Sequence, residues 1–431
     1  MSKNRCFMSR LIIDNIGPIS HIDIPINRVN VIIGKQSSGK STIAKVLSFC
    51  LWLEKDIVAH QDKDYIDSEL LKKELLNYHK IANYFNEGAY IHYEGNYITF
   101  EYHDLEHFNI TMKESFKNAK NGKVAYIPSE RNLVVLNNIS SLPMDKSYVR
   151  DFLFNWLTAH SKYSKKEAMP IVDLNVRYYY DEESKSDRII LPNEKELEID
   201  EASSGIQSVI PLYIYMNYVT KWIFENEEGT SYDKYSVIRK ALLKEIAHDA
   251  DDAEIDSYLG SPSLQMKIQE NLALIRKTTK EYLNKIDLAT VSDLMERLEK
   301  PHYANMIIEE PELNLFPQTQ VRLIYAMLKE IDFGRDMVLM TTHSPYTLYA
   351  VNNCMLSYKV AKDLDEEDKA SLLSYSSRIN PDMVSVWQTN DDGTLSDIKT
   401  SPFGLIGKHY FNEVMNDTLD EYHAMIDYLE L

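Results

Sequence analysis

The apolar positions of this sequence recur with a period of two in some stretches and near 3.6 in others, so strands and helices are both expected. Residues 11–13 and 21–26 alternate around Gly17-Pro18 and predict two short strands. Residues 90–93 and 97–102 alternate on either side of Glu94-Gly95-Asn96, which predicts a hairpin, and residues 107–112 extend its sheet. Apolar runs at 29–33, 305–308 and 337–340 predict buried strands.

Helical spacing in other stretches completes the prediction of an α/β fold. The predicted helices cover residues 42–54, 65–85, 145–162, 209–224, 235–248, 264–299, 346–351 and 408–430. Further strands are expected at 123–127, 171–180, 188–199 and 355–358, and a hairpin is centred on residues 391–393. A helix over 264–299 spans roughly 50 Å at most, so residues 225–301 predict a compact helical insertion and no long coiled-coil arm.

Three segments follow from this pattern. Residues 1–208 and 302–431 are expected to form two parts of one domain with a mixed central sheet and an antiparallel β lobe near the N-terminus. Residues 209–301 are expected to form the helical insertion between them.

Composition narrows the class of protein. The formal net charge of -19 argues against a surface broadly committed to nucleic-acid phosphates, although a local basic groove is compatible with it. Cys6, Cys50 and Cys354 are scattered without metal-ligand spacing, which fits a reducing compartment. The first ten residues lack a long apolar stretch, and residues 209–224 contain polar interruptions, so a cytoplasmic protein without a membrane span is expected.

The most informative motif follows the apolar run at 29–33. It has the G-x-x-x-x-G-K-[ST] spacing of a phosphate loop between a strand and a helix, in the required order. The predicted nucleotide-binding residues are Gly34, Lys35, Gln36, Ser37, Ser38, Gly39, Lys40, Ser41 and Thr42. In such a loop the lysine reaches the β- and γ-phosphates of ATP, and the serine hydroxyl binds Mg²⁺. The sequence therefore predicts a P-loop nucleoside triphosphatase.

A second motif follows the apolar run at 305–308. Glu309 and Glu310 are adjacent carboxylates at the end of a predicted buried strand, an arrangement that is unusual without a cation. In a Walker B site the first carboxylate holds Mg²⁺, which assigns Glu309 with Ser41 to the metal. The second polarises the attacking water, so Glu310 is predicted to be catalytic.

Together these motifs resemble the ABC-type ATPase heads of the SMC, RecF and OLD group. Residues 11–42 are similar to the N-terminal lobe of that group, and residues 309–317 resemble its Asp-Glu-Pro-Glu…Leu-His-Pro pattern. Two departures are Glu309 in place of Asp, which implies looser Mg²⁺ geometry and slower hydrolysis, and Phe316 in place of His. The resemblance also implies that His343, after the next strand, reaches the γ-phosphate.

Residues 203–207 resemble the Leu-Ser-Gly-Gly-Gln signature of ABC-type heads. Ser204, Gly205 and Gln207 match that consensus, whereas Ser203 and Ile206 depart from it. In the family this helix start contacts the ATP of a second subunit, which implies an ATP-sandwiched homodimer. The alternative is a plain serine cap of the helix.

A polar loop follows the predicted strand at 123–127. In ABC-type heads a loop near this point senses the γ-phosphate and Mg²⁺, and here it carries Glu130 and Arg131. The alternative is a surface turn with a local ion pair, and the sequence leaves the two interpretations equal.

The resemblance implies a regulatory ATPase of an anti-phage or toxin-type module, acting through a separate effector protein. The alternatives are a RecF-like ATPase that binds DNA during repair and a scaffold stabilised by ATP with little turnover. OLD nucleases need a later Asp-x-Asp on a strand, and residues 391–393 are better interpreted as a hairpin turn. No nuclease activity is therefore expected.

Overall fold

The computed structural model describes residues 9–426 and 428, apart from 137–138, 140–142, 173 and 227–287. The helix predicted at 235–248, most of the helix predicted at 264–299 and most of the helical insertion lie outside these residues. Only α9 (Leu288–Glu299) is described near the end of that region.

A six-stranded sheet forms the centre of the molecule, with strand order β15-β14-β3-β13-β12-β7. Five of its strands are parallel, and only the short edge strand β15 is antiparallel. Their bounds are β3 (Val29–Ile33), β7 (Lys123–Ile127), β12 (Ala304–Glu309), β13 (Met337–Thr342), β14 (Val384–Thr389) and β15 (Leu395–Asp397). The predicted buried strands at 29–33, 305–308 and 337–340 are confirmed as three neighbours in this sheet.

The uninterrupted apolar runs in these strands arise because both faces of the sheet are covered. Successive side chains of a strand point to opposite faces. Val31 of β3 therefore packs in one core with Val338 of β13, while Ile32 and Leu339 pack in a second core on the other face.

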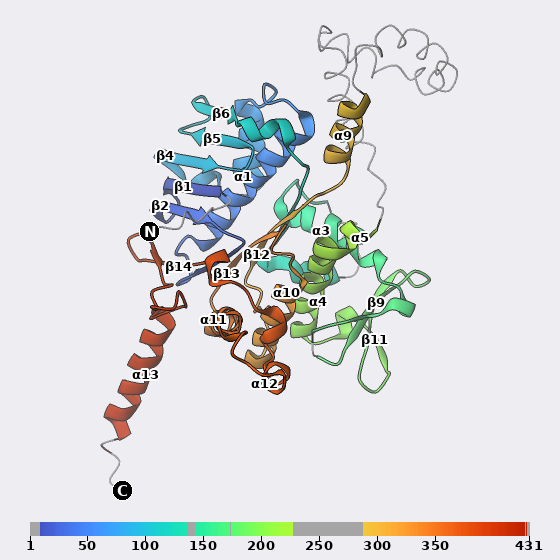
Figure 1. Cartoon of the computed structure of the whole chain (residues 1–431), viewed down its shortest axis with the longest axis vertical. Helices are drawn as coiled ribbons and strands as arrows, with labels where there is room; N and C mark the ends of the chain where they lie inside the picture. The colour runs from blue at the N-terminus through green and yellow to red at the C-terminus, as the bar shows by residue number, and fades with distance from the viewer. Residues whose placement is uncertain are drawn as a thin grey trace.

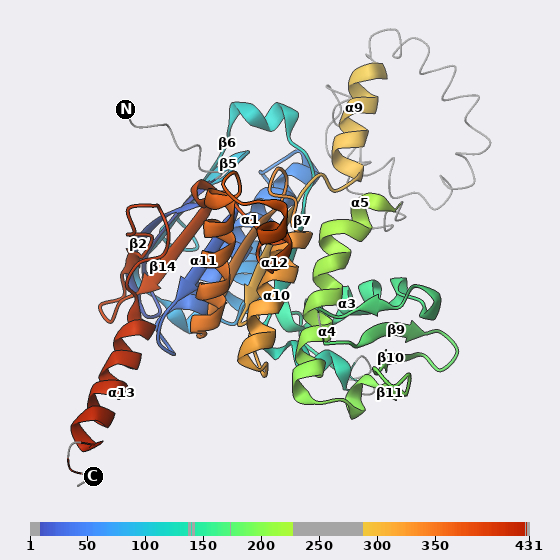
Figure 2. The same ribbon diagram turned by 60° about the horizontal axis from the view of Figure 1, so that its bottom comes forward.

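Different elements cover the two faces (Figures 1 and 2). One core joins the sheet to α10 (Pro317–Glu330), α11 (Pro345–Val360), α4 (Ser204–Asn217) and α3 (Tyr148–Ala159). The other core joins it to α1 (Lys40–His60) and to an antiparallel sheet that packs beyond this helix. Helix α4 is buried along most of its length, as predicted for residues 209–224, and continues as a π-helical turn (Tyr218–Trp222) into α5 (Ile223–Glu225).

The antiparallel sheet is the β lobe expected near the N-terminus. Its strand order is β2-β1-β4-β5-β6. The strands are β1 (Ser9–Ile16), β2 (Ile19–Ile26), β4 (Phe85–Glu94), β5 (Ile98–Tyr102) and β6 (Phe108–Met112). Tyr93 and Phe100 face each other across β4 and β5 and are both buried, which makes them a cross-strand aromatic pair of the core.

Four local predictions differ from the structure. Residues 188–199 were expected to form one strand, but they form parts of β10 (Ser186–Ile190) and β11 (Glu196–Glu198), because a turn closes where the Leu191 N–H donates to the Lys195 carbonyl at 2.9 Å. The strand predicted at 171–180 is shorter in the structure. Only its end lies in a longer strand, β9 (Arg177–Asp181), which pairs with β8 (Met169–Pro170).

The helix predicted over 65–85 is interrupted, and the strand predicted at 355–358 is helical. The first is broken into α2 (Ser68–Leu71), a π-helix (Lys72–Asn77) and a 3₁₀ turn (Ala82–Tyr84). The second belongs to the long helix α11, in which buried Met355 and Ser357 alternate by chance with exposed Leu356 and Tyr358.

The C-terminal part contains the predicted hairpin and the predicted last helix. Strands β14 and β15 pair around residues 390–394, and Gly393 in their turn has a φ of 78°. Helix α13 (Tyr410–Ile426) has no buried residue and projects away from the rest of the molecule (Figures 1 and 2). Within the described residues, every helix is too short or too polar to cross a lipid bilayer.

Candidate functional site

The phosphate loop connects β3 to α1 through two glycines with backbone conformations that disfavour side chains. Gly34 has a φ of 153° and Gly39 a φ of 96°. A Cβ added at Gly34 would lie 1.7 Å from the Thr389 hydroxyl oxygen. That hydroxyl donates to the Ser38 hydroxyl at 2.7 Å, and its oxygen also lies 3.3 Å from the Ile33 carbonyl. β14 therefore supports the loop, a role of Thr389 that no local motif in the sequence indicates.

Lys40 is the first residue of α1, and its side chain is only 5% exposed. Its ammonium donates to the Gly34 carbonyl at 3.0 Å and to the Lys35 carbonyl at 2.6 Å. Burial lowers the Lys40 pKa to about 8, although the nearby carboxylates of Glu310, Glu312 and Glu309 act in the opposite direction. The predicted phosphate-binding cation is thus held inside the loop by backbone carbonyls.

The side chains of Lys35 and Ser38 make further contacts in the loop. The Lys35 ammonium lies 2.8 Å from both carboxylate oxygens of Asp391, which lies in the turn of the C-terminal hairpin. This ion pair raises the Lys35 pKa. Ser38 donates its hydroxyl to the Lys35 carbonyl at 2.7 Å. These contacts fix the loop shape from its outer side.

The carboxylate pair follows β12, at the same edge of the sheet as the phosphate loop. Glu309 is the last residue of β12 and is buried, and Glu310 next to it has a φ of 45°. The Glu310 N–H donates to the Thr341 carbonyl of β13 at 2.8 Å. This sharp turn separates the two carboxylates, which leaves Glu309 inside the protein and brings Glu310 toward the loop.

Glu309 has the surroundings of a cation ligand. Burial raises its pKa, while the Ser41 hydroxyl and the Lys45 ammonium favour its ionised form. Its Oε1 atom has no hydrogen-bond partner within the described part of the chain. A buried carboxylate oxygen without a partner, beside a serine hydroxyl, fits the ligand set that P-loop proteins offer to Mg²⁺. The described residues contain no cluster of three or more His, Cys, Asp or Glu side chains suited to a metal.

His343 follows β13 and lies next to the second carboxylate. Its Nε2 atom is 3.7 Å from Glu310 Oε1. Burial and then the Lys40 charge lower the His343 pKa, whereas Glu310 raises it. The buried Glu312 carboxylate accepts hydrogen bonds from the His343 N–H and the Thr342 hydroxyl, both at 2.8 Å. Glu312 therefore ties the turn after β12 to the loop that carries His343.

These groups meet at one cavity of about 630 Å³. Its walls include most of the phosphate loop together with Glu310, Thr341 and His343. Lys40 and Ser41 also line it, so three parallel strands bring the predicted loop, the second carboxylate and the histidine together. Tyr84, which is 42% exposed, forms another part of the wall, and it lies in a stretch whose pattern predicted only a helix.

Arg131 is neither a phosphate sensor in the cavity nor part of an exposed turn with a local ion pair. Its side chain is fully buried, and its guanidinium donates to five backbone carbonyls, those of Pro128, Ser208, Glu309, Glu310 and Pro311. Burial lowers its pKa to about 10. Arg131 thus fixes the backbone of the carboxylate turn from behind, whereas Glu130 is exposed and accepts a hydrogen bond from the Tyr148 hydroxyl at 3.1 Å.

The three signature-like residues lie outside the phosphate-loop cavity. Ser204 is exposed at the first position of α4, and Gln207 donates to the carbonyls of Asp200 and Ala202 at 2.9 and 3.0 Å. A Cβ added at Gly205 would lie 2.9 Å from the Asn314 carbonyl oxygen, so this helix start packs closely against the segment after the carboxylates. The cap residue of α4 is Ser203, and its side chain makes no capping hydrogen bond, which contradicts the plain serine cap.

No protein-family model and no curated protein matches this chain. The SMC head domain from Thermotoga maritima is similar at 10% identity, over 79% of this chain and 90% of that one, with a TM-score of 0.35. The Smc head domain derived from Pyrococcus furiosus, bound to the C-terminal domain of ScpA, gives 8% identity over 96% and 98% of the chains and a TM-score of 0.35.

The recombination mediator protein RecF is also similar. It gives 12% identity over 91% of this chain and 98% of that one, with a TM-score of 0.30. At these identities and TM-scores, the function has to be argued from the residues of the site.

Proposed function

We propose that this protein binds ATP with Mg²⁺ and hydrolyses the ATP. The observation that carries the proposal is the convergence of Lys40, Ser41, Glu310 and His343 on one cavity at the carboxyl edge of the central sheet. Ligands of open α/β sheets bind at this edge.

Each side chain has a distinct part in this proposal. Lys40 and the start of α1 hold the β- and γ-phosphates, because the ammonium and the helix dipole both favour negative charge. Ser41 and Glu309 hold Mg²⁺, which neutralises phosphate charge when bound. Glu310 accepts a hydrogen bond from the attacking water, and His343 contacts the γ-phosphate from beside it.

A substitution at Lys40 tests the ATPase proposal. Lys40→Ala should lower ATP turnover roughly 10²–10³-fold, because it removes the cation placed against the transferred phosphoryl group. Lys72→Ala, at an exposed lysine that does not line the cavity, is the matched control and should turn over as the unchanged protein does. The proposal fails if Lys40→Ala retains wild-type ATP affinity and turnover.

A homodimer with ATP between the subunits is proposed as the active form. The support is that Ser204, Gly205 and Gln207 lie outside the subunit's own cavity, on a helix start that packs against the carboxylate segment. A second copy would bring this helix start to the nucleotide.

Regulation of a separate effector protein is proposed as the outcome of the ATP cycle. Helix α13 supports a protein partner, because Met415, Leu419 and Met425 are each about half exposed on it and no residue of this helix is buried. The net charge of -19 weighs against an extended DNA contact. The motif resemblance to OLD-like ATPases supports a place in an anti-phage or toxin-type module.

A further inference from the structure

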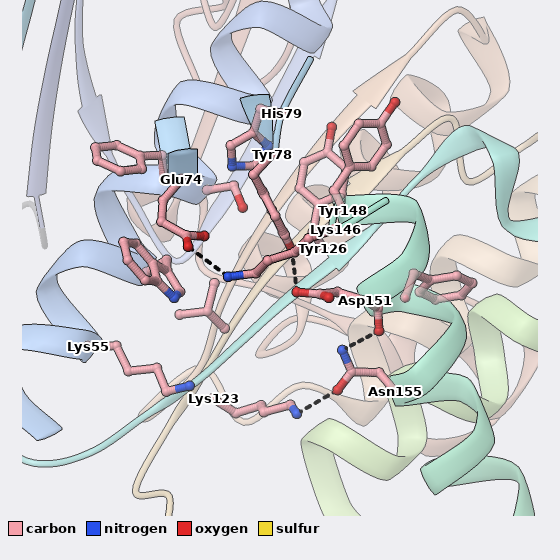
Figure 3. Close-up of a pocket in the computed structure, with 15 residues that line it drawn as sticks. Lys55, Glu74, Tyr78, His79, Lys123, Tyr126, Lys146, Tyr148, Asp151 and Asn155 are labelled. Carbon is pink, nitrogen blue, oxygen red and sulfur yellow. Dashed lines mark hydrogen bonds and ion pairs between the residues drawn. The ribbon is translucent and has the colours of Figure 1, made fainter. Parts of the chain in front are cut away.

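A second cavity, of about 230 Å³, lies behind the proposed nucleotide site (Figure 3). Helix α1, the π-helix, strand β7 and helix α3 contribute to its walls. Tyr126 of β7 lines this cavity and lies near Glu309, because burial and then the Glu309 charge raise the pKa of the Tyr126 hydroxyl. Phe49, Trp52, Tyr78 and Phe152 add further aromatic rings to the walls.

Polar groups without partners line this cavity. His79 is 2% exposed, and its Nδ1 atom has no hydrogen-bond partner among the described residues. Burial lowers the His79 pKa to about 3, so the imidazole is neutral. The buried Tyr126 hydroxyl likewise has no hydrogen-bond partner among the described residues. Lys55 is half-buried and adds an ammonium to the lining, and burial lowers its pKa while the neighbouring Asp56 raises it. Buried polar groups in proteins are nearly always paired, which points to a ligand.

The acidic groups of the cavity are already engaged (Figure 3). Glu74 accepts a hydrogen bond from the Lys146 ammonium at 2.7 Å, and Asp151 accepts one from the Tyr78 hydroxyl at 2.9 Å. Lys123 donates to the Asn155 side-chain oxygen at 3.0 Å. In Figure 3 Lys55 and Lys123 lie at the bottom of the cavity, whereas His79 lies at its top. The cavity is therefore cationic at one end and offers a neutral hydrogen-bonding group at the other.

We propose that this cavity binds a small organic phosphate, with its phosphoryl group at Lys55 and Lys123 and its planar body among the aromatic walls. Lysine ammonium groups act as compact point charges toward phosphate, whereas carboxylate recognition favours the planar fork of arginine, which is missing from this lining. Planar ligands pack favourably against tryptophan and tyrosine rings. His79 at the far end offers a hydrogen bond to a polar group on the ligand. This site is separate from the phosphate loop, so the inference does not depend on ATP binding.

Calorimetric titration of the full chain with phenyl phosphate tests the inference. We expect one saturable site per chain. Lys55→Met should weaken binding roughly ten- to a hundredfold, because it removes a charge-assisted contact while keeping the length of the side chain. Lys123→Met should weaken it as well and serves as a second variant. Lys72→Met, at an exposed lysine outside the cavity, should leave the affinity unchanged.

Two further titrations separate this site from its competitors. Lys40→Met should bind phenyl phosphate as the unchanged protein does, because Lys40 lies in the other cavity. Loss of binding in Lys40→Met together with retention in Lys55→Met would place the probe in the phosphate loop and overturn the inference. Absence of binding would overturn it too, and so would benzoate binding as tightly as phenyl phosphate, because the site would then not select a phosphoryl group.

Discussion

At the scale of single residues, Lys40 combines a positive charge with burial, and this makes its charge sensitive to pH. Its pKa is lowered to about 8 by desolvation. The ammonium is therefore fully charged below about pH 7 and becomes neutral as the pH rises through 8. A neutral amine attracts phosphate far less strongly than an ammonium.

ATP affinity should consequently fall as the pH rises above about 8, approaching tenfold per pH unit when binding requires the ammonium. Lys40→Met should bind weakly and lose this dependence. Lys35→Met is the matched control in the same loop and should keep the dependence, because the ion pair with Asp391 raises the Lys35 pKa. Fluorescence titration of a labelled ATP analogue between pH 6.5 and 9, values chosen to bracket the Lys40 pKa of about 8, gives these affinities. A flat profile for the unchanged protein would contradict the assignment of Lys40.

The residues of local motifs could be predicted from the sequence, and those of distant contacts could not. Lys40 and Ser41 follow from spacing alone, because a phosphate loop is continuous in the chain. Glu310 could be predicted as a candidate site residue because an apolar strand ends in adjacent carboxylates there. Arg131 could not be assigned, because its acceptors at 309 and 310 lie nearly 180 residues further along the chain. Thr389 is similarly separated from Ser38, to which it donates.

At the scale of elements, Arg131 connects the turn after β7 with α4 and with the segment after β12. One side chain satisfies carbonyls from all three. Each of these buried carbonyls costs roughly 1–3 kcal/mol when it has no partner. The position of Glu310 therefore depends on a group that does not line the phosphate-loop cavity.

Arg131→Lys should lower the free energy of unfolding by roughly 2–5 kcal/mol, because an ammonium cannot reach all of these carbonyls. It should also lower turnover more than ATP affinity, since the phosphate loop keeps its contacts while the carboxylate turn loosens. Urea unfolding and steady-state kinetics measure the two effects. Glu130→Gln, at the exposed neighbour, is the control and should change neither. If Arg131→Lys unfolds and turns over as the unchanged protein does, Arg131 has no positioning role.

Sequence periodicity predicted the elements best where burial was two-sided. The strands at 29–33, 123–127 and 337–340 were predicted correctly because helices or sheets cover both of their faces. The strand predicted at 355–358 was wrong because this run of four residues lies inside α11 and is too short to distinguish the two periods. The π-helix at Lys72–Asn77 has a spacing that neither period describes.

At the scale of the whole molecule, the cavity of the phosphate loop and the start of α4 lie on separate parts of the subunit. Ser204 is exposed and makes no contact with the phosphate loop cavity. Gly205 lies against Asn314, in the segment that continues from Glu310, so movement of α4 is linked to the position of the carboxylates. A partner subunit bound at Ser204 would thus act on the site from outside.

ATP should therefore drive dimerisation of the chain more strongly than ADP, because in the proposed dimer only the γ-phosphate would reach a second subunit's helix start. Glu310→Gln keeps the shape of the cavity but removes the carboxylate proposed to polarise water, so it should accumulate as the ATP-bound dimer. Light scattering coupled to gel filtration should then give twice the 50.1 kDa of the single chain with ATP, and the single-chain mass with ADP.

Ser204→Arg added to Glu310→Gln supplies the decisive comparison. A bulky cation at the exposed start of α4 should block close approach of the second subunit and leave the single-chain mass with either nucleotide. Glu106→Arg places the same side chain in the exposed turn between β5 and β6, and it should leave the ATP-dependent dimer intact. Equal masses of Glu310→Gln with ATP and ADP, together with wild-type turnover of Ser204→Arg alone, would refute the homodimer. The start of α4 would then be a packing surface for the segment after β12, and each subunit would complete its own site.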